Sequence, residues 1–272
     1  MTDFTTLVAQ TIGKHFVALS CVQHPPSNSP EKLHLFSGFV VSVLDEWFYI
    51  TAGHILRDIR TAIASGSSFD NWRLDDQTAK NQFNGIAVPY EFDAEKWLVI
   101  RDETSGLDYA AVQLSDFYRR PLEVGGIIAI AKNAWGDHVT EYDHWVLMGI
   151  PSETVNYDGE TIITARVIMS PLIPSKEPVS AGEKAQNQFY AKPIDNSESI
   201  FKSAVGLSGA PVFLLKKVGE QWKYKLIGIQ STWYELTKIL AICPFFSLGL
   251  ELEKIVAEAH AILNHPKDKP NL

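Results

Sequence analysis

The sequence has few cysteines and no sign of a secretory signal. Cys21 and Cys243 are the only two cysteines in 272 residues, so they cannot form a disulfide framework. The N-terminus lacks the basic segment and following apolar block of a signal peptide. Both absences favour a reducing compartment. We expect a cytoplasmic protein whose two cysteines are buried free thiols.

Long apolar runs and basic runs are also missing. No window approaches the roughly 18 uninterrupted apolar residues of a membrane-spanning helix. The net charge is -8, and no run of Lys or Arg offsets it, which argues against a nucleic-acid partner. Hydrophobic residues make up 46% of the chain and charged residues 21%, as in a globular protein with a sizeable core. We predict no membrane partner and no nucleic-acid partner.

The spacing typical of metal ligands is absent as well. None of the eight histidines forms a His-x-x-x-His pair beside an acidic residue. No motif for another cofactor stands out. We therefore predict a protein with neither a metal nor a cofactor.

Short apolar runs separated by turn residues dominate the chain. The first runs are His15–Val22, Leu33–Val43 and Trp47–Thr51, and a proline-rich loop separates the first two. Turn signals every eight to twelve residues or so are typical of a sandwich or barrel, not of alternating strands and helices. The sequence therefore predicts an all-β fold.

A second series of strands begins after Arg120, which suggests two domains. We place the N-terminal domain at residues 1–120 and the C-terminal domain at residues 121–272. Near the end of the chain, apolar residues are spaced three and four apart until Pro266. This pattern predicts an amphipathic helix at about 250–263.

One stretch, Gly206–Val212, combines a serine with flanking glycines. Glycine has no Cβ, so the backbone can turn sharply beside Ser208 and a second molecule can approach closely. The N–H groups of Gly206 and Ser208 can then point at one spot, which suits a developing oxyanion. The same string also describes an ordinary tight turn before a strand. The catalytic interpretation is favoured over the turn only if the chain also supplies the partner residues that a nucleophilic serine needs.

Two further residues supply such partners. His54 follows a predicted strand in Thr51–His54, where a rigid sheet would hold its ring in an accessible position. Asp108 stands at the start of the apolar run Asp108–Leu114. An aspartate there is often a turn residue, but it can also orient a histidine and stabilise its protonated form.

These three segments, in the order His54, Asp108 and Ser208, resemble the signature segments of the trypsin-like (chymotrypsin-fold) serine peptidases. The resemblance implies two packed six-stranded antiparallel β-barrels with a C-terminal α-helix. It implies a serine endopeptidase that acts on a protein or peptide through an acyl-enzyme. His54 would be the base, Asp108 its orienting acid and Ser208 the nucleophile, and the N–H groups of Gly206 and Ser208 would form the oxyanion hole.

By the same resemblance, the substrate pocket would have Lys202 in its floor and Ser231, Thr232 and Trp233 in its wall. Lys202 would favour an acidic substrate side chain, or else lie on a solvated loop and point outward. Leu207 stands where zymogen-activated relatives carry an aspartate for a newly cut N-terminus. An apolar residue cannot hold an ammonium ion in a dry site, so we expect no such activation.

Two alternatives stand beside the peptidase. A catalytically silent module of the same fold would bind peptides by strand pairing, but it has no reason to keep all three residues. An esterase of the α/β-hydrolase type requires a different order of the three residues and is rejected. A predicted surface loop, Pro171–Ala191, would restrain activity until a substrate or an activating protein partner orders it.

Overall fold

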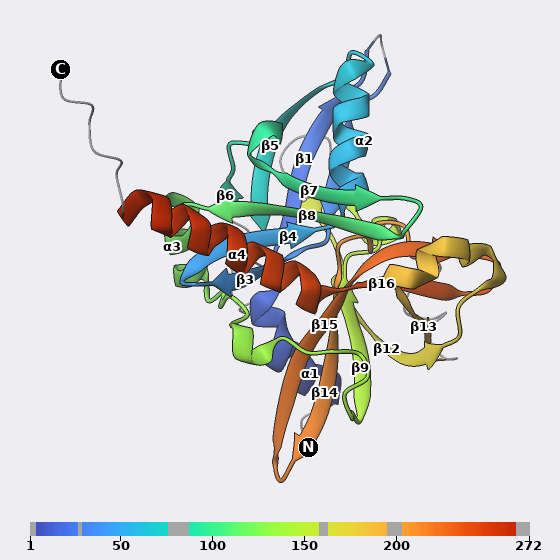
Figure 1. Ribbon diagram of the computed structural model, residues 1–272. Helices are drawn as coiled ribbons and strands as arrows, with labels where there is room; N and C mark the ends of the chain where they lie inside the picture. The colour runs from blue at the N-terminus through green and yellow to red at the C-terminus, as the bar shows by residue number, and fades with distance from the viewer. Residues whose placement is uncertain (1–3, 27–28, 76–86, 158–162, 195–202, 265–272) are drawn as a thin grey trace.

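The computed structural model describes residues 4–26, 29–75, 87–157, 163–194 and 203–264. Strands predominate, as predicted, and each ladder between named strands is antiparallel. Strands up to residue 114 lie in the upper part of Figure 1 and later strands in the lower part. The described part of the chain contains no helix that is both long enough and apolar enough to cross a membrane.

The strands of the first half form two four-stranded sheets. The first has the order β2-β1-β5-β6 and the second the order β3-β4-β8-β7. The strands of the first sheet are β1 (Ala18–His24), β2 (Lys32–Phe36), β5 (Ser68–Asp75) and β6 (Val88–Pro89). Those of the second are β3 (Phe39–Val43), β4 (Glu46–Thr51), β7 (Leu98–Asp102) and β8 (Leu107–Leu114).

The predicted closed six-stranded barrel is therefore not confirmed for the first half, where the described strands form two separate sheets. The run Leu33–Val43, predicted as one strand, is broken at Ser37 and Gly38 into β2 and β3. Gly38 passes so close to the Tyr49 ring that a Cβ would collide with it. At the other edge, β6 has two residues and ends at Pro89, which has no N–H to extend a ladder.

The strands of the second half do close into a six-stranded barrel, as predicted. Its order is β12-β13-β16-β15-β14-β9. These strands are β9 (His144–Gly149), β12 (Ile168–Ser175), β13 (Phe189–Pro193), β14 (Pro211–Val218), β15 (Gln221–Tyr234) and β16 (Ile239–Pro244). A short hairpin, β10 (Asn156–Tyr157) and β11 (Ile163–Thr164), lies outside the barrel.

Four α-helices occur among the described residues: α1 (Phe4–Ile12), α2 (Gly53–Ala64), α3 (Asp116–Gly125) and α4 (Phe245–Asn264). The 3-10 segments are η1 (Gly13–His15), η2 (Ala94–Lys96), η3 (Lys132–Ala134), η4 (Ser152–Thr154) and η5 (Val179–Asn187). The predicted C-terminal helix is confirmed and begins earlier than expected, directly after β16.

The two terminal helices connect the halves of the molecule. Val8 and Ile12 of α1 are buried in a core cluster that also contains Phe213 of the barrel. Leu248 and Leu252 of α4 belong to the same cluster. Figure 1 shows α1 beside β14 and β15, and α4 running back across β3 and β4. The first and last helices thus pack across the boundary between the predicted domains.

The segment Pro171–Ala191 is not the extended surface loop that we predicted. Its ends belong to β12 and β13, and η5 lies between them. Two side chains at the end of η5 anchor it: Asn187 Nδ2 donates to the Ser105 carbonyl and Gln188 Nε2 to that of Gly106, at 2.8 and 2.9 Å. The proline, serine, glycine and lysine content predicts a loop, but paired strands and these hydrogen bonds hold most of the segment.

Candidate active site

The N-terminus of α2 brings His54 and Asp108 together. β4 ends at Thr51 and α2 begins at Gly53, with Ala52 as an N-cap residue whose side chain cannot accept a hydrogen bond. Asp108 supplies the missing acceptor: the backbone N–H of His54 donates to its Oδ1 at 2.7 Å. A carboxylate is also favoured by the positive end of the helix dipole. Asp108 therefore caps the helix that carries His54.

Gly53 allows this close approach. A Cβ at Gly53 would lie 2.9 Å from the carbonyl oxygen of Tyr109 and 3.1 Å from Asp108 Oδ1. β4 and β8 are paired up to Thr51 and Ala110, so their ends bring Gly53 and Asp108 to the same edge of the sheet. The glycine before the histidine thus fits a position where the backbone must touch the next strand.

The His54 ring is fixed by the second oxygen of the same carboxylate. His54 Nδ1 donates to Asp108 Oδ2 at 2.7 Å, and the Ser231 hydroxyl donates to the same oxygen at 2.6 Å. Burial alone would raise the pKa of Asp108. The hydrogen bonds from the His54 ring, the Ser231 hydroxyl and the His54 backbone outweigh it and lower the pKa below its usual value. Asp108 is therefore a buried, ionised acceptor.

This arrangement determines what the His54 ring can do. Because Nδ1 carries the proton donated to Asp108, the neutral ring has its lone pair on Nε2. Nε2 has no hydrogen-bond partner among the residues that the structure describes. The His54 side chain is 25% exposed, so Asp108 fixes the ring at Nδ1 while part of the ring stays accessible. Such a ring can accept a proton at Nε2.

Two tight turns build the loop around Ser208. Gly206 and Gly209 have φ of 89° and 86°, the left-handed region that favours glycine. The N–H groups of Leu207 and Ala210 close the turns onto Ala204 and Leu207. That of Gly209 donates to the Gln230 carbonyl.

Two N–H groups of this loop are left over. Those of Gly206 and Ser208 have no partner within the described part of the chain. The Gly206 carbonyl, by contrast, is fixed: it accepts a hydrogen bond from the Ser37 hydroxyl at 3.0 Å. Ser37 is fully buried and also accepts from the Ile150 N–H. The peptide after Gly206 is thus held with its carbonyl turned to Ser37.

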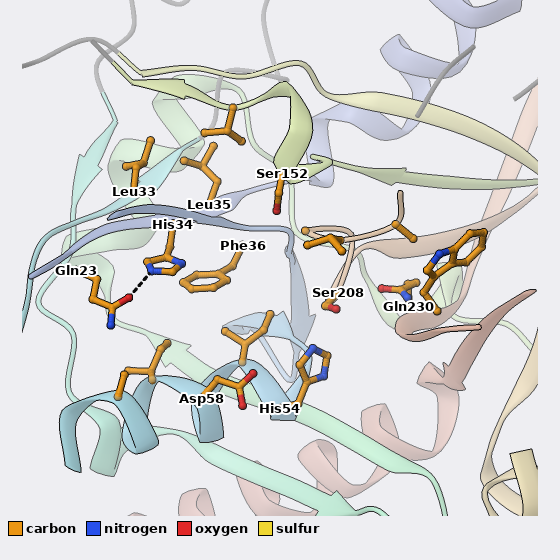
Figure 2. A pocket seen from close by; sticks show the side chains of 18 of the residues that line it. Gln23, Leu33, His34, Leu35, Phe36, His54, Asp58, Ser152, Ser208 and Gln230 are labelled. Carbon is orange, nitrogen blue, oxygen red and sulfur yellow. Dashed lines mark hydrogen bonds between the residues drawn. The ribbon is translucent and has the colours of Figure 1, made fainter. Parts of the chain in front are cut away.

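A groove with a volume of about 610 Å³ runs past His54 and Ser208. Figure 2 shows both side chains projecting into it, from α2 and from the loop before β14. The first half contributes Gln23, Leu33, His34, Leu35, Phe36, His54, Ile55, Asp58, Ile59, Ala62 and Phe69. The second half contributes Ser152, Val155, Ala204, Val205, Gly206, Ser208, Gln230 and Trp233. The groove therefore lies between the two halves.

Of the described residues predicted for the substrate pocket, one lines the main groove. Trp233 lines the groove, but Ser231 is buried and its hydroxyl is turned to Asp108 instead. Ser231, Thr232 and Trp233 together line a second, smaller cavity on the Asp108 side of His54. Lys202 lies outside the described residues. A β-bulge between Gln230 and Thr232 accounts for the change of side-chain direction along β15.

Sequence reasoning missed Ser37, Gln230 and the helix α2. The helix had a visible signal, because Ile55, Leu56 and Ile59 are buried at helical spacing on its inner face. Ser37 and Gln230 had no signal, because their contacts with the Ser208 loop join residues far apart in the chain.

Comparison of whole structures identifies the fold. The chain is similar to the inactivated protease paralogue S-D1 of the scabies mite, with a TM-score of 0.52 and 12% identity, over 92% of this chain and 94% of that one. It also resembles the thermostable serine protease AL20 of an extremophilic microorganism (TM-score 0.43, 16% identity, 86% and 94% covered). The serine protease domain of the Sesbania mosaic virus polyprotein is similar with a TM-score of 0.45 and 12% identity, over 87% of this chain and 90% of that one.

By sequence, the chain matches no protein-family model and no curated protein. The structural likeness to the mite paralogue nevertheless covers nearly all of both chains. This protein has the chymotrypsin-like fold of the trypsin-like serine peptidases, as the sequence resemblance implied. At this level of identity, the likeness establishes the fold alone.

Proposed function

We propose that this protein is a serine endopeptidase with His54, Asp108 and Ser208 as its catalytic residues. One observation carries the proposal: the His54 ring is oriented by a buried carboxylate and opens onto the groove that Ser208 lines. Burying an ionised aspartate costs free energy unless hydrogen bonds replace its lost hydration. Here three donors supply such bonds to Asp108. Such an arrangement suits general-base catalysis.

In the proposed reaction, Ser208 Oγ attacks the carbonyl carbon of the scissile peptide bond. His54 Nε2 takes the hydroxyl proton as the new C–O bond forms, and Asp108 stabilises the resulting imidazolium. The tetrahedral intermediate collapses, the C–N bond breaks, and the proton passes from Nε2 to the leaving amine. Water then attacks the acyl-enzyme by the same route and releases the acid and free Ser208.

The unpartnered N–H groups of Gly206 and Ser208 support an oxyanion hole at this loop. The hydrogen bond from the Ser37 hydroxyl supports this role, because it holds the Gly206 carbonyl turned toward Ser37. Donors that are already oriented stabilise the developing charge without reorganisation, and one such donor contributes about 3–4 kcal/mol to transition-state stabilisation.

A catalytically silent peptide-binding module is the second candidate. The mite protein of the same fold is an inactivated paralogue, so the fold by itself does not imply catalysis. In this chain, Ser208, His54 and Asp108 can supply a nucleophile, a base and an orienting acid. That set favours the enzyme.

Leu207 supports an activity that does not depend on a cut N-terminus. It is fully buried in the apolar cluster of the barrel, which offers no counter-charge for an ammonium group. We propose that the protein acts inside the cell without proteolytic maturation, with substrate binding or a protein partner as the means of regulation.

The proposal is tested by incubation of the purified protein with a mixed peptide library, with cleavage followed by mass spectrometry. The wild type should cut internal peptide bonds, and Ser208→Ala and His54→Ala should not. Ser247→Ala is the control, because Ser247 is exposed on α4 and is not among the groove residues. Equal cleavage by Ser208→Ala, or no cleavage by any folded variant, would contradict the proposed function.

A further inference from the structure

Gln230 is a buried polar residue with no evident structural role for its side chain. It is 1% exposed and lines the groove that contains Ser208. Its Oε1 atom is enclosed and has no hydrogen-bond partner within the described residues. Figure 2 shows the amide at the Ser208 end of the groove. Buried polar atoms are normally hydrogen-bonded, so this exception requires an explanation.

The backbone of Gln230 fixes the side chain relative to Ser208. Gly209 N–H donates to the Gln230 carbonyl at 2.9 Å, and Gln230 N–H donates to the Ala210 carbonyl at 2.9 Å. The two bonds join β15 to the residues directly after Ser208. The Gln230 backbone is therefore fixed beside the loop that carries Ser208, and its side chain starts from this fixed position.

An apolar residue would be the stable choice at this position. The neighbouring strand residues Ile227 and Ile229 are fully buried apolar side chains, and Gly228 lies between them. A buried acceptor without a partner has lost its hydration uncompensated, a cost that an apolar group of the same shape avoids. The amide thus costs stability in the free protein, and a ligand that hydrogen-bonds to it would remove that cost.

The surroundings of the amide restrict the chemistry of that ligand. The residues from the second half that line this end are uncharged: Ser152, Val155, Ala204, Val205 and Trp233. The acidic residue of the groove, Asp58, lies on α2 and is already hydrogen-bonded to Arg57. A cationic side chain would find no free counter-charge among the residues that line the groove, and a hydrocarbon would leave Oε1 unpaired.

We propose that Gln230 is a specificity-determining residue that selects glutamine or asparagine as the substrate residue whose carbonyl Ser208 attacks. A carboxamide offers N–H groups to Oε1 and a carbonyl to Nε2, so it matches the Gln230 amide in both directions. The inference rests on the proposed peptidase function and adds its substrate class. It differs from the acidic preference that Lys202 would give if it lay in the pocket floor.

The test uses four peptides that differ only at the residue before the scissile bond: Gln, Leu, Lys or Glu. For the wild type we expect kcat/KM for the Gln peptide to exceed that for the others by about ten- to a hundredfold. Gln230→Met keeps the shape and removes the amide, so the preference should shift to Leu while Tm is unchanged or higher. Gln230→Glu should shift it to Lys. Gln113→Leu makes a similar change at an exposed position and should alter nothing.

A preference for Glu in the wild type, or an unchanged preference in Gln230→Met, would overturn the inference. So would a marked loss of Tm in Gln230→Met, since that would assign the amide a structural role. Binding of the same peptides to Ser208→Ala separates this inference from the proposed function. Selective binding of the Gln peptide that Gln230→Met abolishes supports the inference even if the wild type cleaves nothing. Equal binding of all four peptides contradicts it.

Discussion

Asp108 holds His54 at two points, through the backbone N–H and through ring Nδ1, both at 2.7 Å. One carboxylate thus caps the helix and orients the ring that the helix carries. Ser231 adds a third donor, on the oxygen that faces the ring. The position of the proposed base therefore depends on contacts from β8, α2 and β15.

Asp108→Asn tests the orientation of the ring. Asn can still accept the His54 backbone N–H, so the cap and the fold should survive. Its side-chain amide would donate to Nδ1 and leave the proton on Nε2, the wrong tautomer for a base. We expect kcat/KM to fall by about 10³- to 10⁴-fold with little change in the circular dichroism spectrum. Activity within a fewfold of the wild type would exclude the proposed role.

Ser231→Ala removes one of the hydrogen bonds that lower the pKa of Asp108. The variant should lose about 1.5–3 kcal/mol of stability at pH 7, because one hydrogen bond to an ionised group is lost. The wild-type pKa of Asp108 is depressed, so its contribution is present above the unfolded pKa and lost as pH falls through the folded one. The stability difference between the two proteins should therefore shrink in acid. Urea denaturation at pH 7 and pH 3 measures it, and a difference independent of pH would contradict the assignment.

His15 gives the fold a separate dependence on pH. Its ring is buried, with Nδ1 donating to the Ile128 carbonyl at 2.5 Å and Nε2 accepting from the Tyr224 hydroxyl at 2.7 Å. Burial lowers the pKa of His15 from 6.5 to about 4, because a charged ring is poorly solvated there. The unfolded chain therefore binds a proton first, and stability should fall between pH 6.5 and pH 4 by up to about 3 kcal/mol.

The contribution of His15 is measured by denaturant unfolding across that range, with His15→Phe for comparison. The variant should be less stable at pH 7, since Tyr224 and Ile128 lose a partner, but its stability should depend less on pH. An equally steep dependence in both proteins would show that other groups are responsible.

Gly209→Ala tests how tightly the Ser208 loop fits against the first half. Gly209 has a left-handed φ of 86°, and a Cβ there would collide with Thr51 Oγ1 and the Ser37 carbonyl. We expect a loss of about 2–4 kcal/mol in the free energy of unfolding. Gly219→Ala is the matched control: its φ is 62°, and a Cβ would meet nothing within 4 Å. That variant should lose only about 1 kcal/mol, and equal losses would show that the contact with Thr51 is unimportant.

The sequence predicted the candidate catalytic motifs, many strands and the C-terminal helix from neighbouring residues, but it missed α1, α2 and α3. The segments around His54, Asp108 and Ser208 each have a local signal, as does the helix α4. The Leu33–Val43 run was predicted as one strand, because nothing in its apolar pattern shows that Gly38 must pass under the Tyr49 ring. Closure of the first barrel, which depends on pairing between distant strands, is not confirmed: the described strands of the first half form two four-stranded sheets.

Features that depend on contacts across the fold were not predictable. Ser231 was expected in the substrate pocket, but the bulge in β15 turns it to Asp108. Gln230 looks like any polar residue in a strand until the barrel places it against the loop after Ser208. The site residues with a motif could thus be found in the sequence, whereas those that tune the site required the structure.

The most direct test of the account is reaction with a fluorophosphonate probe, followed by intact mass and peptide mapping. An activated serine beside oriented N–H donors reacts with such a probe, whereas an ordinary serine does not. We predict one adduct on the wild type and on Ser247→Ala, mapped to Ser208, and none on Ser208→Ala. Folded wild-type protein that stays unlabelled, or an adduct that persists in Ser208→Ala, would contradict the central claim.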